Sequence, residues 1–383
     1  MKKALLTATV QHHFTSFHLP LIAMLRERGY EVHVAAHNVM GDAIRLQLEA
    51  AADRVIDLPF DRSPLSPINR SAYKMLRQLI RENDYDVIHC NTPMGGILTR
   101  LAARSARRHG TVVIYTAHGF HFYPGASSMN WLLFYPVEKA FGRLFTDCLI
   151  TICNEDEQTA RRHRMCRNIC RTHGVGAKED RFFPVDEAEK QALRRQLGLK
   201  ADDILCLCTG ELNINKNQKQ LVAATAQVVK DQPAFCLLCA GAGDQEQALR
   251  QQIDELGLQD HVKLLGYRTD VEQFVKVSDM IASVSYREGL PVNIMEGMLC
   301  AKPAVATHNR GHNELIADGV SGFLVDFGDV DATAKALGEL AAQPELRQTM
   351  GQAARDRSSV YGSQNVMREM ERIYTEFVFN HSK

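Results

Sequence analysis

The fold of this chain is best predicted from one stretch, Arg287-Glu-Gly-Leu-Pro-Val-Asn-Ile-Met-Glu296. The residues before it, 279–285, form an apolar run typical of a buried strand, and residues 292–300 carry apolar side chains at helical spacing. A Gly-Leu-Pro turn therefore joins a strand to a helix, and Glu288 lies in that turn. Because open α/β sheets bind ligands at the carboxyl ends of their strands, the turn is a predicted ligand site.

The same turn offers a ligand both amides and carboxylates. The backbone amides of Val292 and Asn293 would be unpaired at the start of the helix, where anions bind. Glu296 lies about one turn further into the helix and could reach the same ligand. In the alternative interpretation, Glu288 is a solvated loop residue and Glu296 an ordinary surface residue.

The Glu-x7-Glu spacing of Glu288 and Glu296 resembles the signature of the family 4 glycosyltransferases. The resemblance continues through residues 300–307 and 311–325, which makes it far more specific than the two carboxylates alone. Members of this family, including those of bacterial exopolysaccharide and capsule synthesis, are retaining enzymes that use nucleotide-sugars. The resemblance implies the GT-B fold, an α/β fold of two Rossmann-like domains whose parallel sheets face each other across a cleft.

Length and composition agree with two α/β domains. The chain has 383 residues, of which 45% are hydrophobic and 23% charged, the balance of a soluble globular protein. The apolar run at residues 4–10 is too short to span a membrane and has no cleavage site after it, so we predict a first buried strand. The domains are expected at residues 1–185 and 186–362, with residues 363–383 packing back on the first.

Charge is unevenly distributed along the chain. Residues 1–172 contain 22 Lys and Arg against 15 Asp and Glu, a net of +7, which leaves −7 for the remainder because the whole chain is neutral. A basic N-terminal half would suit an anionic partner, either lipid or a pyrophosphate-linked acceptor. Ordinary variation between domains explains the asymmetry equally well.

Ten cysteines raise the question of a metal site or disulfides. Four of them lie in strand-like runs: Cys206, Cys208, Cys236 and Cys239. Neighbouring strand residues point to opposite faces, so these side chains are poorly placed to share one ion, and free cysteine is common in protein cores. Cys166 and Cys170 have helical spacing but no second matching pair. Free thiols without a secretion signal favour a cytoplasmic protein.

The N-terminal half alternates strands and helices in the order of a parallel sheet. Strands are predicted at 3–10, 30–37, 55–58, 86–90, 111–117 and 149–153, and helices at 18–29, 68–81 and 94–109. Residues 11–18 are expected to form a loop after the first strand, and the family's counterpart is often rich in glycine, whereas this stretch has none. We expect His12, His13 and Phe14 to contact the acceptor, although the histidines could instead cap the helix.

Two further histidines follow the strand at 111–117. The sequence Thr116-Ala-His-Gly119 resembles the family's Thr-x-His-Gly, whose histidine reaches the donor sugar or the reacting phosphate, so His118 is a catalytic candidate and His121 an acceptor contact. The aromatic segment 130–145 could form an acceptor groove, a membrane-interface patch or a partly buried helix. The basic stretch 161–171 is expected to be a helix with a solvated cationic face, because no nucleic-acid motif accompanies it.

The C-terminal half is expected to hold the donor. The loop after the strand at 204–209 would meet the diphosphate through Lys216, although Glu211 stands where the family commonly has arginine. The resemblance places the nucleobase at the loop after the strand at 262–266. The residues expected to contact the donor are Gly210, Asn213, Lys216, Tyr267, Arg268, Gly289, Leu290, Val292, Asn293 and Glu296.

These observations predict a retaining glycosyltransferase that moves a sugar from a nucleotide diphosphate, expected to be uridine-linked, to a glycan acceptor. Glu288 would contact the sugar, Glu296 the ribose, and Lys216 the departing diphosphate. The preferred acceptor is a polyprenyl-pyrophosphate-linked sugar of surface-glycan synthesis, which the basic N-terminal domain could approach at the inner face of the membrane. We expect no cofactor and no essential metal.

Three alternatives stay open at this point. A nucleotide-sugar epimerase of the same two-domain fold would convert its donor without an acceptor. A non-enzymatic metal- or redox-sensing protein would use the cysteines. A nicotinamide oxidoreductase is disfavoured, because Gly241-Ala-Gly243 lacks the rest of a dinucleotide-binding fingerprint.

Overall fold

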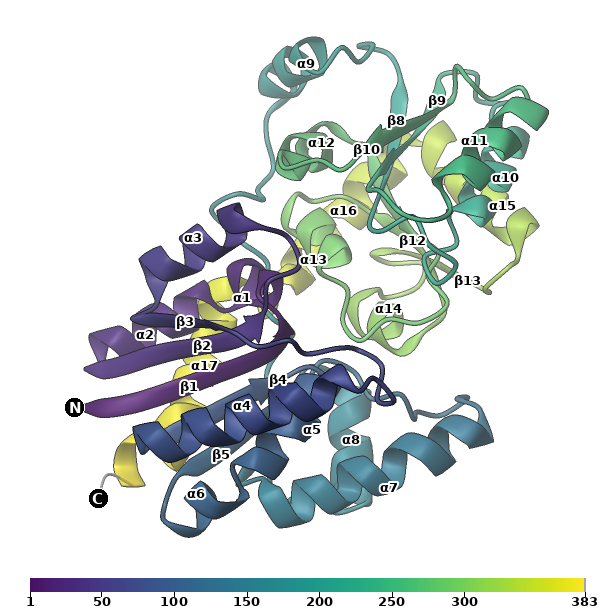
Figure 1. Ribbon diagram of the computed structural model, residues 1–383. Helices are drawn as coiled ribbons and strands as arrows, with labels where there is room; N and C mark the ends of the chain where they lie inside the picture. Colours follow the sequence, from purple (N-terminus) through teal and green to yellow (C-terminus); the bar gives the residue numbers. More distant parts are fainter. Residues whose placement is uncertain (382–383) are drawn as a thin grey trace. The chain divides into compact units, whose positions relative to one another are not determined.

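The computed structural model describes residues 1–381, which fold into two compact units (Figure 1). The N-terminal unit comprises Met1–Val175 and the C-terminal segment from Val366, and the C-terminal unit comprises Gly176–Asn365. The boundary thus lies at Gly176, whereas the sequence placed it at 186. Each unit is built around one parallel sheet with helices on it, which confirms the predicted α/β class with two Rossmann-like domains.

The N-terminal unit contains a parallel sheet with the strand order β3-β2-β1-β4-β5-β6-β7. Its central strand β1 pairs with β2 on one side and β4 on the other, so that Ala4 lies opposite both Val32 and Val87. The three side chains are fully buried, as expected for a sheet covered on both faces. The strands are β1 (Lys2–Val10), β2 (Tyr30–His37), β3 (Arg54–Asp57), β4 (Val87–Asn91), β5 (Val112–Ala117), β6 (Cys148–Thr151) and β7 (Asn168–Arg171).

The last helix of the chain packs in the core of the N-terminal unit. Met370, Ile373 and Tyr374 are buried in one cluster with residues of β1 and β2, and the Tyr374 hydroxyl is hydrogen-bonded to Nδ1 of His89 at 2.8 Å. The helices that cover this sheet are α1 (His12–Phe17), α2 (Leu19–Glu27), α3 (Asp42–Ala51), α4 (Ile68–Asn83), α5 (Pro93–Ala102), α6 (Arg104–Arg108), α7 (Ser128–Phe145), α8 (Asn154–Arg162) and α17 (Ser363–Phe377), followed by the 3₁₀ turn η1 (Phe379–His381).

The C-terminal unit contains a parallel sheet with the order β10-β9-β8-β11-β12-β13. The strands are β8 (Ile204–Thr209), β9 (Phe235–Ala240), β10 (Val262–Gly266), β11 (Met280–Ser283), β12 (Ala304–Thr307) and β13 (Gly322–Val325). The helices are α9 (Glu187–Gln196), α10 (Gln218–Val228), α11 (Glu246–Glu255), α12 (Val271–Val277), α13 (Val292–Leu299), α14 (Arg310–Leu315), α15 (Val330–Ala342) and α16 (Pro344–Ser358). The predicted strand–turn–helix around Glu288 is therefore β11, its loop and α13.

The strand cysteines lie in the core of the C-terminal unit, and all ten cysteines are free thiols. Cys208 of β8 lies opposite Cys239 of β9, and both side chains are buried. Burial raises the pKa of Cys206 well above its usual value, which keeps this thiol protonated and unreactive.

Two local predictions were wrong. Residues 12–17 form the short helix α1 and not a loop, since the stretch contains neither glycine nor proline and Phe14 is buried as an anchor in the core. Residues 161–171 do not form one helix. Helix α8 ends at Arg162, Arg164 has a left-handed φ of 49°, and residues 168–171 then join the sheet as β7.

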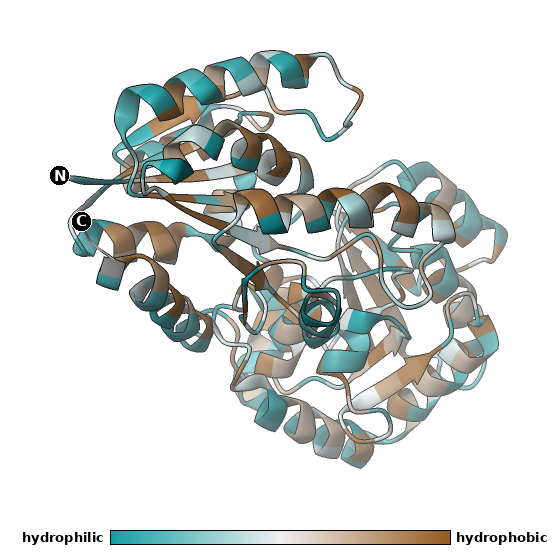
Figure 2. Cartoon of the chain, turned by 90° about the horizontal axis from the view of Figure 1, so that it is seen from below, coloured by the Kyte–Doolittle hydropathy of each residue, from teal (hydrophilic) through white to brown (hydrophobic). Residues whose placement is uncertain are grey.

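Hydropathy follows the layers of the fold. In Figure 2 the helices carry both brown and teal along their length, as expected of amphipathic helices that cover a sheet. Within residues 1–381, no helix is both long enough and apolar enough to cross a membrane.

Candidate active site

The predicted site residues gather where the strand order of each sheet reverses. In the N-terminal unit this point lies between β1 and β4, and in the C-terminal unit it lies between β8 and β11. Such switch points open a crevice at the carboxyl ends of the strands, where α/β proteins bind ligands. His13 follows β1, whereas Lys216 follows β8 and Glu288 follows β11. Each unit therefore carries its own candidate half-site.

In the C-terminal unit, an ion pair joins Lys216 and Glu288 at the switch point. The Lys216 Nζ lies 2.6 Å from Oε1 of Glu288, and the two side chains are only 22% and 14% exposed. Burial alone would raise the pKa of Glu288, but the ammonium of Lys216 beside it holds that pKa below its usual value. The Glu288 carboxyl group is therefore ionised beside the ammonium of Lys216.

The loop that carries Lys216 depends on Gly210 and Asn213. Gly210 has a φ of 142°, and a Cβ there would lie 3.2 Å from the Lys216 Cε, so a side chain would disturb both the backbone and the lysine. The Asn213 Oδ1 accepts a hydrogen bond from the Lys216 backbone N–H at 2.9 Å, and its Nδ2 donates to Glu211 at 3.0 Å. Asn213 thus shapes the loop and engages the glutamate that replaces the family's arginine.

The start of α13 is tied to the end of β8 by Asn293. Its Nδ2 donates to the carbonyl of Thr209 at 3.1 Å, and its Oδ1 accepts from the backbone N–H of Ile294 at 3.0 Å. The Asn293 side chain therefore positions the helix, while the backbone amides of Val292 and Asn293 belong to the first turn, where no intrahelical acceptor exists. Gly311 packs against the Gly289 carbonyl so closely that a Cβ would lie 2.7 Å from it. Leu290 is buried beneath this turn.

Glu296 lies one turn into α13 and is only partly exposed. Burial raises its pKa to about 8, with Arg181 lowering and Glu272 raising it to smaller extents. Among residues 1–381, no hydrogen bond or ion pair engages the Glu296 carboxylate. A partly buried carboxyl group without a protein partner suits the hydroxyls of a ligand.

Of the two predicted donor contacts after β10, one is accessible to a ligand and the other is already paired with a carboxylate. Tyr267 is exposed. Arg268 forms a bidentate pair with Asp270, with Nε and Nη2 donating to the two carboxylate oxygens at 2.8 and 2.6 Å. The Arg268 guanidinium is therefore already neutralised, and the structure favours Tyr267 and the loop backbone as the accessible part of this region.

Sequence reasoning missed Arg310, which lies beside the pair. Its Nε donates to the backbone carbonyl of Glu288 at 3.0 Å, and its side chain is buried. The signal was available, because Arg310 is the one arginine within residues 300–325, the segment that resembles the family. Arg310 fixes the backbone that presents Glu288.

In the N-terminal unit, three histidines converge at the other switch point. Ring nitrogens of His13, His18 and His118 all lie within 4.8 Å of one another. A hydrogen bond of 3.1 Å joins the Nε2 atoms of His13 and His18. The His118 Nε2 lies 3.0 Å from Oδ1 of Asn91 at the end of β4, which fixes its ring. The sequence already placed His12, His13 and His18 within the segment 11–18, and the strand order adds His118 to them.

These imidazoles are neutral at physiological pH. Burial and the neighbouring histidines lower the pKa of His13 and His18 well below the usual value, and burial lowers that of His118 to about 4. His89, buried behind them in β4, has a pKa of about 3 for the same reasons. Neutral imidazoles both donate and accept hydrogen bonds, which suits contacts with sugar hydroxyls.

The histidine cluster is also the group in residues 1–381 whose spacing fits a metal ion. Neutral imidazoles are the ligands that zinc and related ions prefer, and ligand nitrogens on a tetrahedral zinc lie about 3.3 Å apart. The 3.1 Å separation of the His13 and His18 nitrogens is close to that value. No carboxylate of residues 1–381 belongs to the cluster, and the expectation from sequence was that no metal is essential.

Three of the predicted acceptor contacts are buried or engaged by other residues of the N-terminal unit. Phe14 is completely buried in the core of the N-terminal unit, so its side chain is not available to an acceptor. His12 turns toward Ser16, whose Oγ lies 3.1 Å from its Nε2. His121 stacks on Phe134 of α7 with ring centroids 4.6 Å apart. Phe14 was misassigned because an aromatic residue between histidines fits a core anchor and a ligand contact equally well.

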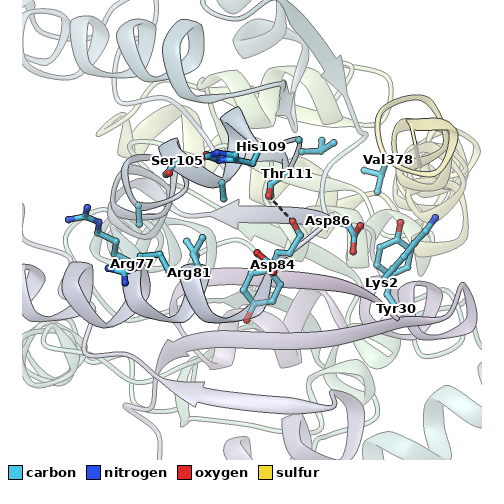
Figure 3. Close-up of a pocket in the computed structure, with 16 residues that line it drawn as sticks. Lys2, Tyr30, Arg77, Arg81, Asp84, Asp86, Ser105, His109, Thr111 and Val378 are labelled. Atoms are coloured by element: carbon cyan, nitrogen blue, oxygen red, sulfur yellow. Dashed lines mark hydrogen bonds between the residues drawn. The ribbon is translucent and has the colours of Figure 1, made fainter. Parts of the chain in front are cut away.

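A separate cavity of about 390 Å³ lies at the opposite edge of the N-terminal sheet (Figure 3). It is lined by the first residues of the strands, including Lys2 and Tyr30, and by Arg77 and Arg81 of α4. Its lining has charges of both signs, because Asp86 lies among them. The cavity contains none of the predicted site residues.

Comparison with known proteins decides the family. Residues 19–174 match the family described as Glycosyltransferase Family 4, and residues 189–357 match the family described as Glycosyl transferases group 1. The chain is 42% identical over 378 residues to "Putative glycosyltransferase EpsD" of Bacillus subtilis (strain 168), covering 98% of this chain and 97% of that protein. The chain belongs to glycosyltransferase family 4.

This family 4 glycosyltransferase also resembles a protein with a more specific name and several solved structures. It is 27% identical over 267 residues to the Escherichia coli UDP-Gal:alpha-D-GlcNAc-diphosphoundecaprenol alpha-1,3-galactosyltransferase, covering 68% of each chain. Anabaena Alr3699/HepE in complex with UDP and glucose superposes with a TM-score of 0.79 at 22% identity, covering 98% of this chain and all of that one. The structural likeness shows the GT-B fold.

Proposed function

We propose that this glycosyltransferase moves a sugar from a uridine diphosphate donor to a lipid-linked glycan acceptor, with retention at the anomeric carbon. One observation carries the proposal: the buried pair Lys216–Glu288 lies at the switch point of the C-terminal sheet, and the helix that follows, α13, carries Glu296, whose carboxyl group has no partner among residues 1–381. A cation, helix amides and two carboxyl groups match the diphosphate, ribose and sugar of a nucleotide-sugar.

When the donor binds, Lys216 and Glu288 would separate from each other and contact the donor instead. Its diphosphate would attract the Lys216 ammonium and the amides of Val292 and Asn293, and Glu288 would then turn to the sugar. These groups act on the charge that grows as the diphosphate leaves, the most effective place for electrostatic catalysis. Because they supply positive charge themselves, we propose that transfer needs no resident metal and no cofactor.

The uridine assignment draws support from the solved relatives. HepE, whose chain aligns over its full length, was crystallised with UDP and glucose. Glu296 would accept hydrogen bonds from the ribose hydroxyls, and the loop at Tyr267 would hold the base. Retention rests on the family, in which the nucleophile meets the sugar on the face of the leaving group. The Nε2–H of the neutral His118 donates to Asn91 Oδ1, so its Nδ1 would accept a hydrogen bond from a sugar hydroxyl.

For the acceptor we propose a polyprenyl-diphosphate-linked sugar of surface polysaccharide synthesis at the cytoplasmic face of a membrane. The Escherichia coli relative is named for a diphosphoundecaprenol acceptor, and the first 172 residues carry a net charge of +7. His13 and His121 are the acceptor contacts in this proposal, with Phe14 removed from the set.

Calorimetric titration of UDP, GDP and their glucose, galactose and N-acetylglucosamine conjugates would test the donor first. At pH 8.5, where the Glu296 carboxyl group is largely ionised, we expect UDP to bind the wild type and to bind Glu296→Ala at least tenfold more weakly, since a charge-assisted hydrogen bond contributes about 1.5–3 kcal/mol. Glu255→Ala, which changes an exposed glutamate of α11, is the matched control. Absence of binding by every nucleotide would overturn the proposal, and conversion of a donor without acceptor would indicate an epimerase.

A further inference from the structure

Helix α7 presents an apolar face outward from the N-terminal unit. The most exposed apolar side chains on it are those of Met129 (58%), Leu132 (69%), Leu133 (56%), Val137 (37%) and Leu144 (60%). Their spacing, together with the exposed Pro136 and Ala140, is that of a single helical face. A helix that covers a sheet normally turns its aliphatic face toward that sheet. Helix α7 instead leaves its aliphatic face exposed.

The opposite face of α7 accounts for its attachment to the unit. The Trp131 indole N–H donates to the carbonyl of Tyr123 at 3.2 Å, and Glu138 forms an ion pair of 2.9 Å with the fully buried Arg100. Phe134 and Tyr135 pack at the edge of a buried cluster with Phe122. The aromatic residues therefore hold the helix in place, and the aliphatic residues are left outside.

Arginines border the exposed face at its C-terminal end. The Arg143 Nε donates to the carbonyl of Arg164 at 2.8 Å, and both side chains are exposed. The guanidinium of Arg104, from α6, lies 5.9 Å from the ring centre of Phe145. The two acids nearest this end are neutralised, because Glu138 pairs with Arg100 and Asp147 pairs with Arg107. The border is thus strongly cationic.

We propose that this surface, made of Met129, Leu132, Leu133, Val137 and Leu144 with Arg104, Arg143 and Arg164, docks the enzyme on an anionic lipid bilayer. An amphipathic helix with an aliphatic face and basic edges lies in the plane of the interface and sinks its apolar side chains into the acyl boundary. Each nearby arginine adds attraction to the negative surface. The docking surface deepens the proposed function, on which it rests, by bringing the N-terminal unit to the lipid that carries the acceptor.

A second copy of the chain fits this surface less well. In a two-fold dimer the same patch meets itself, so the arginine border of one copy would face either the arginine border of the other or the first turn of its α7, which has no acidic residue. Like charges that approach in a partly desolvated interface repel each other, whereas anionic headgroups would neutralise them. Charge complementarity therefore selects the bilayer.

The test is co-sedimentation of the whole protein with vesicles of phosphatidylglycerol and phosphatidylcholine, against vesicles of phosphatidylcholine alone. We expect binding to the anionic vesicles only. Leu132→Ser/Leu133→Ser should lower the partition coefficient at least tenfold, because two leucines leave the apolar phase. Leu46→Ser, which changes a leucine of α3 that is 63% exposed, should stay within about twofold of the wild type.

Charge reversal separates the two parts of the surface. Arg104→Glu/Arg143→Glu should weaken binding at least fivefold for each residue at low salt, whereas Lys200→Glu/Lys230→Glu in the C-terminal unit, where both lysines are exposed, should have little effect. The proposal would be overturned if the wild-type protein did not bind anionic vesicles, or if the serine variant bound them as strongly as the wild type. A fall in molar mass of the serine variant in sedimentation equilibrium would overturn it as well, by showing an interface between copies.

Calorimetric UDP binding is measured on every variant. We expect it to be unchanged, which also shows that the variants are folded. Vesicle binding without UDP binding would leave the docking surface intact and reject the proposed donor. UDP binding without vesicle binding would reject the docking surface and leave the proposed donor intact. The two failures can therefore be told apart.

Discussion

At the scale of single residues, the switch point of the C-terminal sheet concentrates charge in a buried place. Lys216 and Glu288 stabilise each other at 2.6 Å, yet each would pay a desolvation cost if the other were removed. Glu296 has no such partner among the described residues and keeps a raised pKa. These two arrangements lead to different predictions for substitution.

Removing one member of the Lys216–Glu288 pair should lower the free energy of unfolding more than removing both charges. We expect Lys216→Met to lower the free energy of unfolding by about 1–3 kcal/mol, because it leaves the Glu288 carboxylate unpaired, and Lys216→Met/Glu288→Gln to restore most of it. Transfer activity should fall at least about 100-fold in all of these variants, since the group that faces the departing diphosphate is lost. Urea unfolding and a sugar-transfer assay measure the two effects, and additive losses of stability would contradict the pairing.

Glu296 should make the enzyme less stable as the pH rises. Its pKa is about 8 in the folded protein and near 4.5 when unfolded, so between these values the folded state holds a proton that the unfolded state has lost. Stability therefore declines from pH 4.5 to pH 8. Glu296→Gln removes this proton uptake and should raise the free energy of unfolding by about 2 kcal/mol at pH 8.5, with little change at pH 5.

Urea titrations of Glu296→Gln and wild type at the two pH values provide the measurement. The same variant should bind UDP-sugars more weakly, because the amide is a poorer acceptor for ribose hydroxyls than a carboxylate. Equal stabilisation at pH 5 and pH 8.5 would show that burial of the carboxyl group is not the cause.

At the scale of elements, α7 is attached to the N-terminal unit by an ion pair that could not be predicted from its sequence. Arg100 of α5 is completely buried, pairs with Glu138 of α7 and lies with its guanidinium 3.8 Å from the ring centre of Tyr115. A buried arginine is tolerated only with a carboxylate and hydrogen-bond acceptors around it, and its Nε donates to the carbonyl of Gly96 at 3.0 Å. The ion pair thus links α5 to α7.

Glu138→Ala should therefore destabilise the N-terminal unit by about 3–5 kcal/mol, since it leaves the buried Arg100 charge without a carboxylate partner. Arg100→Met/Glu138→Gln should cost much less, because it removes the charge as well as its partner. Chemical denaturation of both variants makes the comparison, with Glu49→Ala on the exposed surface of α3 as the control. A small loss in Glu138→Ala would mean that water reaches Arg100 and that the link is weak.

At the scale of the whole molecule, the two units should differ in how acid changes their stability. The N-terminal unit buries His89 and His118, with pKa values of about 3 and about 4. Both values lie below the usual value near 6.5, so the unfolded state binds protons that the folded unit does not, and stability is lost as the pH falls from 6.5 through 4. In the C-terminal unit, burial lowers the pKa of His312 to about 4, which acts in the same direction, but the raised pKa of Glu296 opposes it between pH 4.5 and pH 8.

Hydrogen exchange read separately for each unit would measure this difference. Between pH 7 and pH 5 we expect protection to fall in β1, β4 and β5, while that of α13 changes much less, after correction for the intrinsic exchange rate. His89→Asn should flatten the response of the N-terminal strands. Parallel changes in both units would show that other titrating groups dominate.

Much of the architecture could be predicted from sequence because it depends on local patterns. Apolar runs ending in polar turns placed β8, β9, β10 and β11 almost to the residue, and the alternation with helices indicated parallel sheets. The turn at Glu288 and the loop at Lys216 were found because ligand sites of such sheets follow the strands. The short helix at 12–17 and strand β7 were missed, since their propensities are weak and tertiary packing decides their state.

Spacing along the chain was enough to indicate the family and the two-domain α/β class, and to select the side chains that we propose for contact with a nucleotide-sugar. Which side chains meet depends on the tertiary structure. Only the order of strands brings Lys216 to Glu288 across 72 positions of sequence and gathers His13, His18 and His118. Only packing shows that α7 turns its aromatic residues inward and its leucines outward, since the helix is apolar on both sides and its periodicity alone cannot choose between them.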